Sequence, residues 1–211
     1  MIKLENVSVS IKKNKILEDI NIEFSEKKIY ILVGENGCGK TILLKTILGF
    51  IPPDKGKVII NDIDIYNKNI FAPNSRAVLE KPEFIKEMTG LDNIKLLTQI
   101  NNIVKDDEIE KWFAKFGLLE QMKCKVETYS LGMLQKLALV QVFVESPNII
   151  VLDEPFNGLD KESIDILNKV IVEEKNKGKI LIVTSHIDDN INSLGDFSYK
   201  IEDKKISKMK S

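Results

Sequence analysis

Residues 29–41, IYILVGENGCGKT, decide the fold of this chain. The continuous apolar run at residues 29–33 is typical of a parallel strand that is covered on both faces. Residues 34–41 match the pattern G-x-x-x-x-G-K-[ST], and apolar residues at helical spacing follow them. A buried strand, a glycine-rich turn and a helix in this order predict a loop that holds the phosphate groups of a nucleotide.

The residue types of this loop suit phosphate binding. Gly34, Gly37 and Gly39 let the backbone turn where a Cβ would block it, so that N–H groups can surround phosphate oxygens. The helix that begins at Lys40 directs the positive end of its dipole toward the same anion. We expect Lys40 to neutralise the β- and γ-phosphates, and the hydroxyl of Thr41 to bind Mg²⁺. The predicted ATP-binding residues here are Gly34, Glu35, Asn36, Gly37, Cys38, Gly39, Lys40, Thr41 and Ile42.

A second motif carries two adjacent carboxylates. Residues 148–155 read NIIVLDEP, so an apolar strand leads directly to Asp153 and Glu154. The carboxyl end of a strand is where ligands bind in open α/β sheets. There Asp153 suits Mg²⁺ coordination through water, and Glu154 suits orienting or deprotonating the attacking water. A helix-capping pair is the alternative interpretation, which the neighbouring phosphate loop disfavours.

The remaining pattern predicts an α/β fold. Strand, helix and strand units flank a helical insertion, which favours a mostly parallel sheet with helices on both faces. We expect one domain, residues 1–211, with a nucleotide-binding core at residues 1–81 and 147–211 and a helical subdomain at residues 82–146. Alternating apolar residues at the start of the chain predict an antiparallel β subdomain. The expected helices span residues 40–49, 89–100, 106–116, 131–145, 161–177 and 188–194, and a terminal hairpin turns at residues 202–204.

Composition limits the class of protein. The chain has 211 residues, of which 43% are hydrophobic and 30% charged, and its net charge is -1, as in an ordinary globular protein rather than a nucleic-acid binder. Two cysteines, Cys38 and Cys124, form no disulfide framework and favour a cytoplasmic location. For Cys38 we favour a role as a small filler over redox sensing. No apolar stretch approaches the ~20 residues of a membrane helix, so another polypeptide must supply any membrane spans.

The motifs, in their order along the chain, resemble those of the nucleotide-binding subunits of ABC transporters. GENGCGKT resembles Walker A, YSLGMLQK (residues 129–136) resembles the ABC signature, and IIVLDEP resembles Walker B with its following glutamate. FNGLD (residues 156–160) resembles the D-loop, and TSH (residues 184–186) resembles the segment with the switch histidine. The resemblance covers nearly the whole chain, and it implies a P-loop NTPase core.

The resemblance also implies roles and partners. Two such subunits, identical or similar, close head to tail around two ATP molecules. Ser130 and Gly132 of one copy then contact the γ-phosphate held by Lys40 of the other, and His186 joins Lys40 and Glu154 as a catalytic residue. Hydrolysis drives a separate transmembrane permease, so the chain is expected at the inner face of the cell membrane and not on nucleic acid.

The chain departs from the family pattern at four positions. Leu131 stands in place of the first glycine of the signature pair, and Met133 stands where glutamine is common. Glu80 stands where the Q-loop glutamine is expected, and by the resemblance it holds Mg²⁺ through water. Ile11 stands near the position of an aromatic residue under adenine, so base stacking is lost and base selectivity is expected to be loose. The combination resembles the subgroup of bacitracin, lantibiotic and sodium exporters, which implies export of an antimicrobial peptide or drug in self-resistance.

Three functions remain open at this point. The first is an active transporter ATPase. The second is a module that dimerises on ATP with weak hydrolysis, which Leu131, Met133 and Ile11 motivate. The third is a non-transport ABC ATPase that acts on DNA or ribosomes, but such proteins carry long coiled coils or a second ATPase domain, and neither fits in 211 residues.

Overall fold

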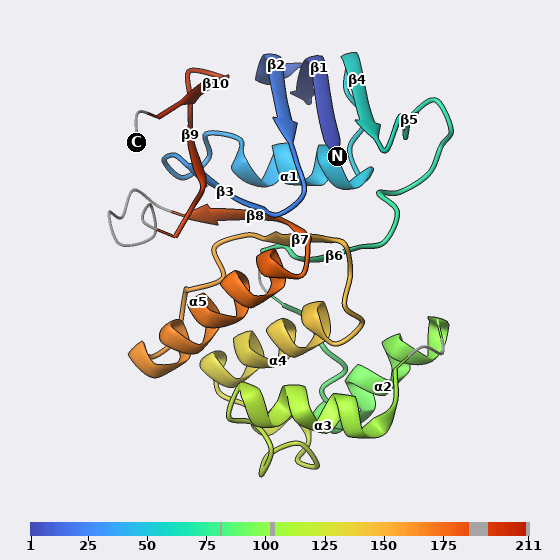
Figure 1. Cartoon of the computed structure of the whole chain (residues 1–211), viewed down its shortest axis with the longest axis vertical. Helices are drawn as coiled ribbons and strands as arrows, with labels where there is room; N and C mark the ends of the chain where they lie inside the picture. Colours follow the sequence, from blue (N-terminus) through green and yellow to red (C-terminus); the bar gives the residue numbers. More distant parts are fainter. Residues whose placement is uncertain (81, 102–103, 186–193, 210–211) are drawn as a thin grey trace.

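The protein consists of two sheets with helix α1 between them and a layer of helices on the far side of the second sheet (Figure 1). The computed structural model describes residues 1–80, 82–101, 104–185 and 194–209. The chain begins in the first sheet and returns to the edge of the second sheet near its C-terminus (Figure 1). This is the predicted α/β fold.

The first sheet is antiparallel, in the order β2-β1-β4-β5. Alternate residues of β1, such as Ile2 and Leu4, are fully buried toward α1, because successive side chains of a strand point to opposite faces. The predicted antiparallel β region at the start of the chain is therefore present. Its strands are β1 (Ile2–Ile11), β2 (Asn14–Phe24), β4 (Lys55–Ile60) and β5 (Ile63–Asp64).

The second sheet has the order β10-β9-β3-β8-β7-β6 and is parallel except for β10. Val33 pairs with Ser185, and Leu152 pairs with Val183, so the strands end at one edge of the sheet. The residues that follow β3 and β7 therefore lie together at this edge. The strands are β3 (Lys28–Val33), β6 (Ser75–Val78), β7 (Ile149–Leu152), β8 (Ile180–Ser185), β9 (Phe197–Glu202) and β10 (Lys205–Lys208).

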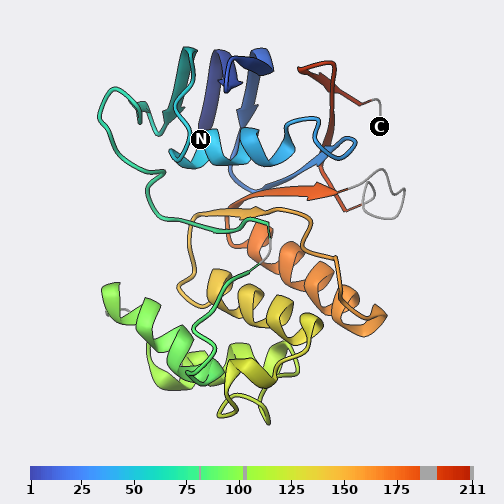
Figure 2. The same ribbon diagram turned by 180° about the vertical axis from the view of Figure 1, so that it is seen from behind.

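The helices lie on both faces of the parallel sheet. α1 lies between the sheets, α4 and α5 cover the other face of the parallel sheet, and α2 and α3 lie beyond α4 (Figure 2). Of the predicted helix at residues 188–194, residues 188–193 lie outside the described residues. The helices are α1 (Lys40–Leu48), α2 (Gly90–Asn101), α3 (Asp106–Lys115), a 3₁₀ turn η1 (Val126–Thr128), α4 (Leu131–Phe143) and α5 (Lys161–Asn176).

Two apolar cores hold these layers together. One lies between the sheets and includes the buried side chains of α1, such as Leu43 and Ile47. The other lies between the parallel sheet and the helices, where the rings of Trp112, Phe116 and Phe143 stack with centroids 5.4 to 6.1 Å apart. The parallel sheet is thus covered on both faces, and the edge where its strands end remains available for a site.

Candidate functional site

The glycine-rich loop, residues 34–39, joins the end of β3 to the start of α1. Gly39 caps α1 with a φ of 110°, a left-handed conformation that residues with a Cβ rarely adopt. At Gly34 an added Cβ would lie 2.7 Å from the carbonyl oxygen of Ile201, so only glycine lets the loop pass β9 this closely. These two glycines set the path of the loop and place the N-terminus of α1 at the edge where the parallel strands end.

Lys40, the first residue of α1, is a nearly buried cation, with 5% of its surface exposed. Its ammonium donates to the carbonyl oxygens of Gly34 at 2.7 Å and Glu35 at 3.1 Å. It also lies 3.5 Å from Oε1 of Glu154. The ammonium is therefore held between the loop and the second motif, where it can form charge-assisted hydrogen bonds with phosphate oxygens.

A cavity of about 280 Å³ opens beside the loop. One part of its wall carries the ammonium of Lys40 and the carboxylate of Glu154, and another part carries the aliphatic side chains of Ile11 and Ile16. This wall suits a ligand that is anionic at one end and apolar at the other. The lining residues are Ile11, Ile16, Asn36, Gly37, Gly39, Lys40, Thr41, Ile42 and Glu154.

Three of the predicted ATP-binding residues, Gly34, Glu35 and Cys38, lie in the loop but not on the wall of this cavity. The partly buried side chain of Cys38 packs against the apolar core between the sheets. This placement agrees with a packing role for Cys38.

Asp153 follows the fully buried strand β7 and is itself 6% exposed. The hydroxyl of Thr41 donates to its Oδ2 at 2.6 Å. The hydroxyl of Thr184, near the end of β8, donates to its Oδ1 at 2.5 Å. The predicted Mg²⁺ residues Thr41 and Asp153 are thus in direct contact, although 112 positions separate them in the sequence.

Thr184 is the first residue of the TSH segment, and no role at the site was predicted for it. It is fully buried, and its hydroxyl also accepts the N–H of Glu154 at 2.8 Å. The signal in the sequence was a polar residue near the end of an otherwise apolar parallel strand, ILIVTS. Such a residue lies at the ligand-binding edge of an open α/β sheet.

Glu154 adopts a strained backbone conformation. Its φ is 48°, in the left-handed region, which costs a residue with a Cβ about 1–3 kcal/mol. Its Oε2 accepts a hydrogen bond of 2.8 Å from the side-chain amide of Asn157, and its Oε1 faces Lys40. Strain of this kind persists where surrounding contacts hold it, and it clusters at functional sites.

Glu80 lies after β6 and has a φ of 57°. Its Oε1 lies 2.6 Å from the ammonium of Lys45, which is on α1 one turn after Thr41. A second cavity, of about 350 Å³, brings Glu80 to the same wall as Thr41 and Asp153. Its lining residues are Thr41, Glu80, Pro82, Leu131, Gln135, Asp153, Glu154, Asn157 and Gly158.

The signature-like segment forms the N-terminus of α4. The hydroxyl of Ser130 accepts the N–H of Met133 at 3.3 Å and caps the helix. At Gly132 an added Cβ would lie 3.0 Å from the carbonyl oxygen of Gly158. In the first turn of this helix, Leu131 is 64% exposed. Ser130 and Gly132 do not line either cavity described above.

His186, the predicted third catalytic residue, lies outside the described residues.

The site matches a known family. The sequence model described as ABC transporter matches residues 17–157, which is well over half of the chain. The chain belongs to this family. It is an ATP-binding subunit of an ABC transporter, it hydrolyses ATP, and it powers a separate permease.

Relatives of this ABC transporter subunit cover nearly its whole length. An uncharacterized ABC transporter ATP-binding protein, YybJ, from Bacillus subtilis is 32% identical over 95% of this chain and 92% of the relative. The lantibiotic transport ATP-binding protein SrtF from Streptococcus pyogenes is 32% identical over 93% of this chain and 85% of the relative. The resemblance to the lantibiotic exporter subgroup is thereby confirmed.

The fold is that of an ATP-binding cassette. A dimeric cassette solved in a post-hydrolysis state with ADP and phosphate superposes with a TM-score of 0.84, at 20% identity, over 100% of both chains. Among the residues that the structure describes, no helix of this ABC subunit is long and apolar enough to cross a membrane.

Proposed function

We propose that this subunit hydrolyses ATP in the cavity beside Lys40 and powers export of an antimicrobial peptide or related drug through its permease. The observation that carries the site is the convergence of two residue pairs at one edge of the sheet. The ammonium of Lys40 lies 3.5 Å from the carboxylate of Glu154, and the hydroxyl of Thr41 lies 2.6 Å from the carboxylate of Asp153. The relative named for lantibiotic transport supports the class of cargo.

Mg²⁺ fits the oxygen atoms at the edge of the sheet. The Thr41 hydroxyl and the Asp153 carboxylate already touch, and Mg²⁺ prefers one or two such oxygens together with substrate phosphates and water. Within the described part of the chain, no group of three or more His, Cys, Asp or Glu side chains forms a metal cage. We expect Thr41 and Asp153 to hold the ion, with Glu80 reaching it through water. Bound Mg²⁺ neutralises charge on the phosphates.

Glu154 is the proposed base. Its carboxylate is oriented by Asn157 and lies beside Lys40, so it faces the place where the γ-phosphate is expected. A carboxylate in this position can orient or deprotonate the attacking water, while Lys40 stabilises charge on the phosphate oxygens. His186 is proposed, from the sequence, as a further catalytic residue.

We propose that two copies close on ATP. In this arrangement Ser130 and Gly132 of one copy contact the γ-phosphate bound by the other, because a capped helix N-terminus with a hydroxyl and a glycine amide suits an anion. The exposed side chain of Leu131 lies on the same turn of α4 and would be covered in such a dimer. The dimeric cassette with ADP and phosphate supports this arrangement. Residues 82–146 are proposed to move as one helical subdomain.

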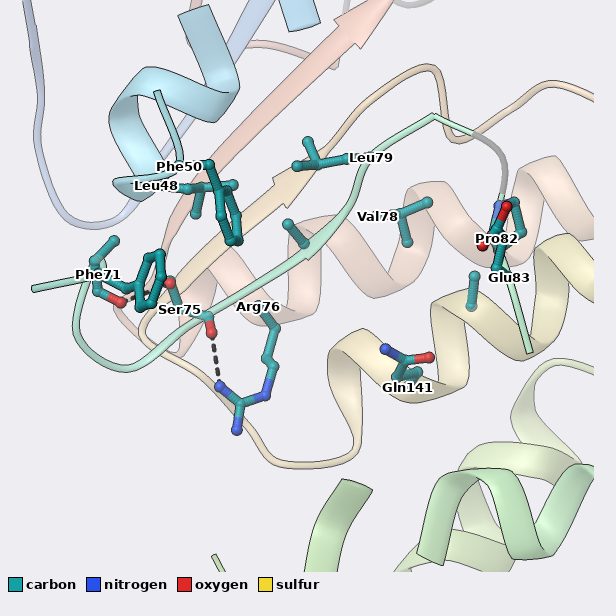
Figure 3. Close-up of a pocket in the computed structure, with 13 residues that line it drawn as sticks. Leu48, Phe50, Phe71, Ser75, Arg76, Val78, Leu79, Pro82, Glu83 and Gln141 are labelled. Carbon is teal, nitrogen blue, oxygen red and sulfur yellow. Dashed lines mark hydrogen bonds between the residues drawn. The ribbon is translucent and has the colours of Figure 1, made fainter. Parts of the chain in front are cut away.

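The proposed contact with the permease is a third cavity, of about 480 Å³, between β6 and α4 (Figure 3). Phe50 and Phe71 lie at one end of it, with ring centroids 5.2 Å apart, and both are exposed. Gln141 of α4 and Pro82 line its other parts, and Pro82 also lines the cavity that contains Asp153 and Glu154. An apolar helical segment of the permease seated here would touch the chain segment that leads to the ATP site.

Single-turnover hydrolysis tests the proposed function. Purified protein in excess over radiolabelled ATP and Mg²⁺ should release phosphate, and Glu154→Gln should bind ATP, form dimers and fail to release it. Normal hydrolysis by Glu154→Gln would show that the base is assigned wrongly. A wild-type protein that dimerises on ATP without hydrolysis would instead favour the dimerising module.

The permease contact has its own test. Phe71→Asp should abolish co-sedimentation with membranes of the native cell and leave ATP affinity intact. Ile63→Asp is the matched control, since Ile63 is also an exposed apolar residue but lies on β5, away from the cavity. Equal membrane binding by both variants and the wild type would refute this contact. Localisation at the inner face of the membrane rests on the same experiment.

A further inference from the structure

One hydroxyl links the two acidic residues of the site. Oγ1 of Thr184 donates its proton to Oδ1 of Asp153 at 2.5 Å and accepts the backbone N–H of Glu154 at 2.8 Å. The hydroxyl therefore contacts one residue through its carboxylate and the next through its peptide. Both hydrogen bonds come from β8, a strand far from β7 in the sequence but directly paired with it.

These two bonds restrain the peptide between the carboxylates. A threonine hydroxyl has a single proton, so donation to Asp153 leaves its lone pairs for the N–H of Glu154. The direction of the Glu154 side chain depends on this peptide, because the residue holds a left-handed φ of 48° that the chain alone does not favour. A contact that fixes the peptide also fixes where the carboxylate points.

Two threonine hydroxyls bind the carboxylate of Asp153 from different elements. Thr41 holds Oδ2 at 2.6 Å from α1, and Thr184 holds Oδ1 from β8. Loss of the Thr184 hydroxyl would leave the carboxylate held from the side of α1 and would remove the acceptor of the Glu154 N–H. Because Thr184 is fully buried, water could not easily take its place.

We propose that Thr184 is a positioning residue for ATP hydrolysis. It does not line the cavity beside Lys40, and it acts by orienting Glu154 and Asp153. The inference rests on the proposed roles of these two carboxylates in hydrolysis. It predicts a lower rate of the chemical step with an unchanged affinity for ATP, because the loop and Lys40 bind the triphosphate.

The test compares three variants at this position. Thr184→Val keeps the shape of the side chain without the hydroxyl, Thr184→Ser keeps the hydroxyl, and Thr184→Ala is a smaller variant without it. We expect Thr184→Val and Thr184→Ala to lower kcat about 10- to 100-fold, the scale of a misplaced catalytic group, with ATP affinity close to that of the wild type. Thr184→Ser should restore most of kcat.

Thr98→Val is the matched control. Thr98 is likewise a buried threonine, and its hydroxyl bonds to carbonyl oxygens of α2, including that of Ile94 at 3.2 Å. This variant loses a buried hydroxyl far from the site and should lower the thermal midpoint without lowering kcat. A purely structural role of Thr184 would give the same result as Thr98→Val.

An ATP-binding measurement separates positioning from general damage. If Thr184 positions Glu154 and Asp153, folded Thr184→Val should bind ATP like the wild type while hydrolysing it slowly, whereas general damage to the site would weaken ATP binding as well. Wild-type kcat in folded Thr184→Val or Thr184→Ala, or equal loss in Thr184→Ser, would overturn the inference. An inactive wild type would refute the proposed function itself, and this inference with it. The wild-type rate therefore distinguishes failure of the proposed function from failure of the Thr184 inference alone.

Discussion

The ammonium of Lys45 lies 2.6 Å from the carboxylate of Glu80 and joins α1 to the segment that follows β6. Lys45 is one turn beyond Thr41 on the same helix, so Glu80 is held near the proposed Mg²⁺ site. The pair also neutralises the carboxylate. The Glu80 carboxylate must therefore release the ammonium of Lys45 before it can interact with Mg²⁺.

The two partners should change the Mg²⁺ requirement in opposite directions. Lys45→Met releases the carboxylate and should lower the Mg²⁺ concentration for half-maximal ATPase rate, whereas Glu80→Gln removes a charge near the ion and should raise it. The pair is partly exposed, and pairs of this kind contribute about 0.2–1 kcal/mol, so we expect shifts up to about fivefold. A Mg²⁺ titration of the ATPase rate measures both.

Lys95→Met is the control for this titration, because Lys95 also forms an ion pair of 2.6 Å, with Asp106, far from the site. Shifts of Lys45→Met and Glu80→Gln in the same direction would contradict the exchange.

Ile11 should limit recognition of the base. Among the described residues, no aromatic side chain lines the cavity beside Lys40, and its apolar wall is formed by Ile11, Ile16 and Ile42. Ile11→Tyr adds a ring, and stacking on a base contributes about 1–3 kcal/mol. We expect tighter binding of ATP, GTP and CTP alike in equilibrium titrations.

Inorganic tripolyphosphate is the control ligand for Ile11→Tyr, since it has no base to stack. Its affinity should stay unchanged. An equal gain for tripolyphosphate, or no gain for any nucleotide, would show that Ile11 does not face the base.

The buried pair of Glu174 and Lys179 should matter for stability. Glu174 is 1% exposed and bonds to Lys179 and Lys177, and Lys179 also donates to Ser146 at 2.8 Å. Glu174→Ala leaves a buried ammonium without its carboxylate, which costs about 3–5 kcal/mol in unfolding free energy. Chemical denaturation measures the loss.

Its neighbour Glu173 provides the matched control. Glu173 pairs with Lys115 at 2.5 Å on the surface, so Glu173→Ala should cost less than about 1 kcal/mol. Similar losses for the two variants would argue against a special role of the buried pair.

The same pair gives a pH dependence. Burial alone raises the pKa of Glu174, but the hydrogen bonds and charges of Lys177 and Lys179 outweigh it and lower the pKa below its usual 4.5. A lowered folded-state pKa stabilises the protein above the unfolded value, and this stabilisation is lost as pH falls through the folded pKa. The difference in unfolding free energy between wild type and Glu174→Gln should therefore be constant at neutral pH and shrink below about pH 4.5. A difference that grows in acid would contradict the shift.

Local patterns predicted much of the fold. The helix predicted at residues 40–49 is α1 (Lys40–Leu48), and the apolar helix after the signature begins at Leu131 as predicted. Such elements can be predicted because glycine spacing and apolar runs of only a few neighbouring residues determine them. The strand β6 (Ser75–Val78) was not predicted, because its short SRAV sequence shows no alternation and the strand is defined by its pairing with β7.

Contacts between distant residues were harder to predict. The roles proposed for Asp153 and Glu154 rest on their own motif, but the contact of Thr184 with both depends on the register of β7 and β8. The pairing of Lys45 with Glu80 likewise depends on where α1 lies relative to the end of β6. Periodicity carries no information about such pairings, which arise from packing of the sheet.

In the proposed function, Lys40 and the glycine-rich loop hold the phosphates of ATP. Isothermal titration of ATP into wild-type protein and folded Lys40→Ala measures this directly. Hydrogen bonds to a charged group contribute about 1.5–3 kcal/mol, so we expect Kd to rise about 10- to 100-fold in Lys40→Ala. An unchanged Kd in Lys40→Ala would show that Lys40 does not hold the phosphates.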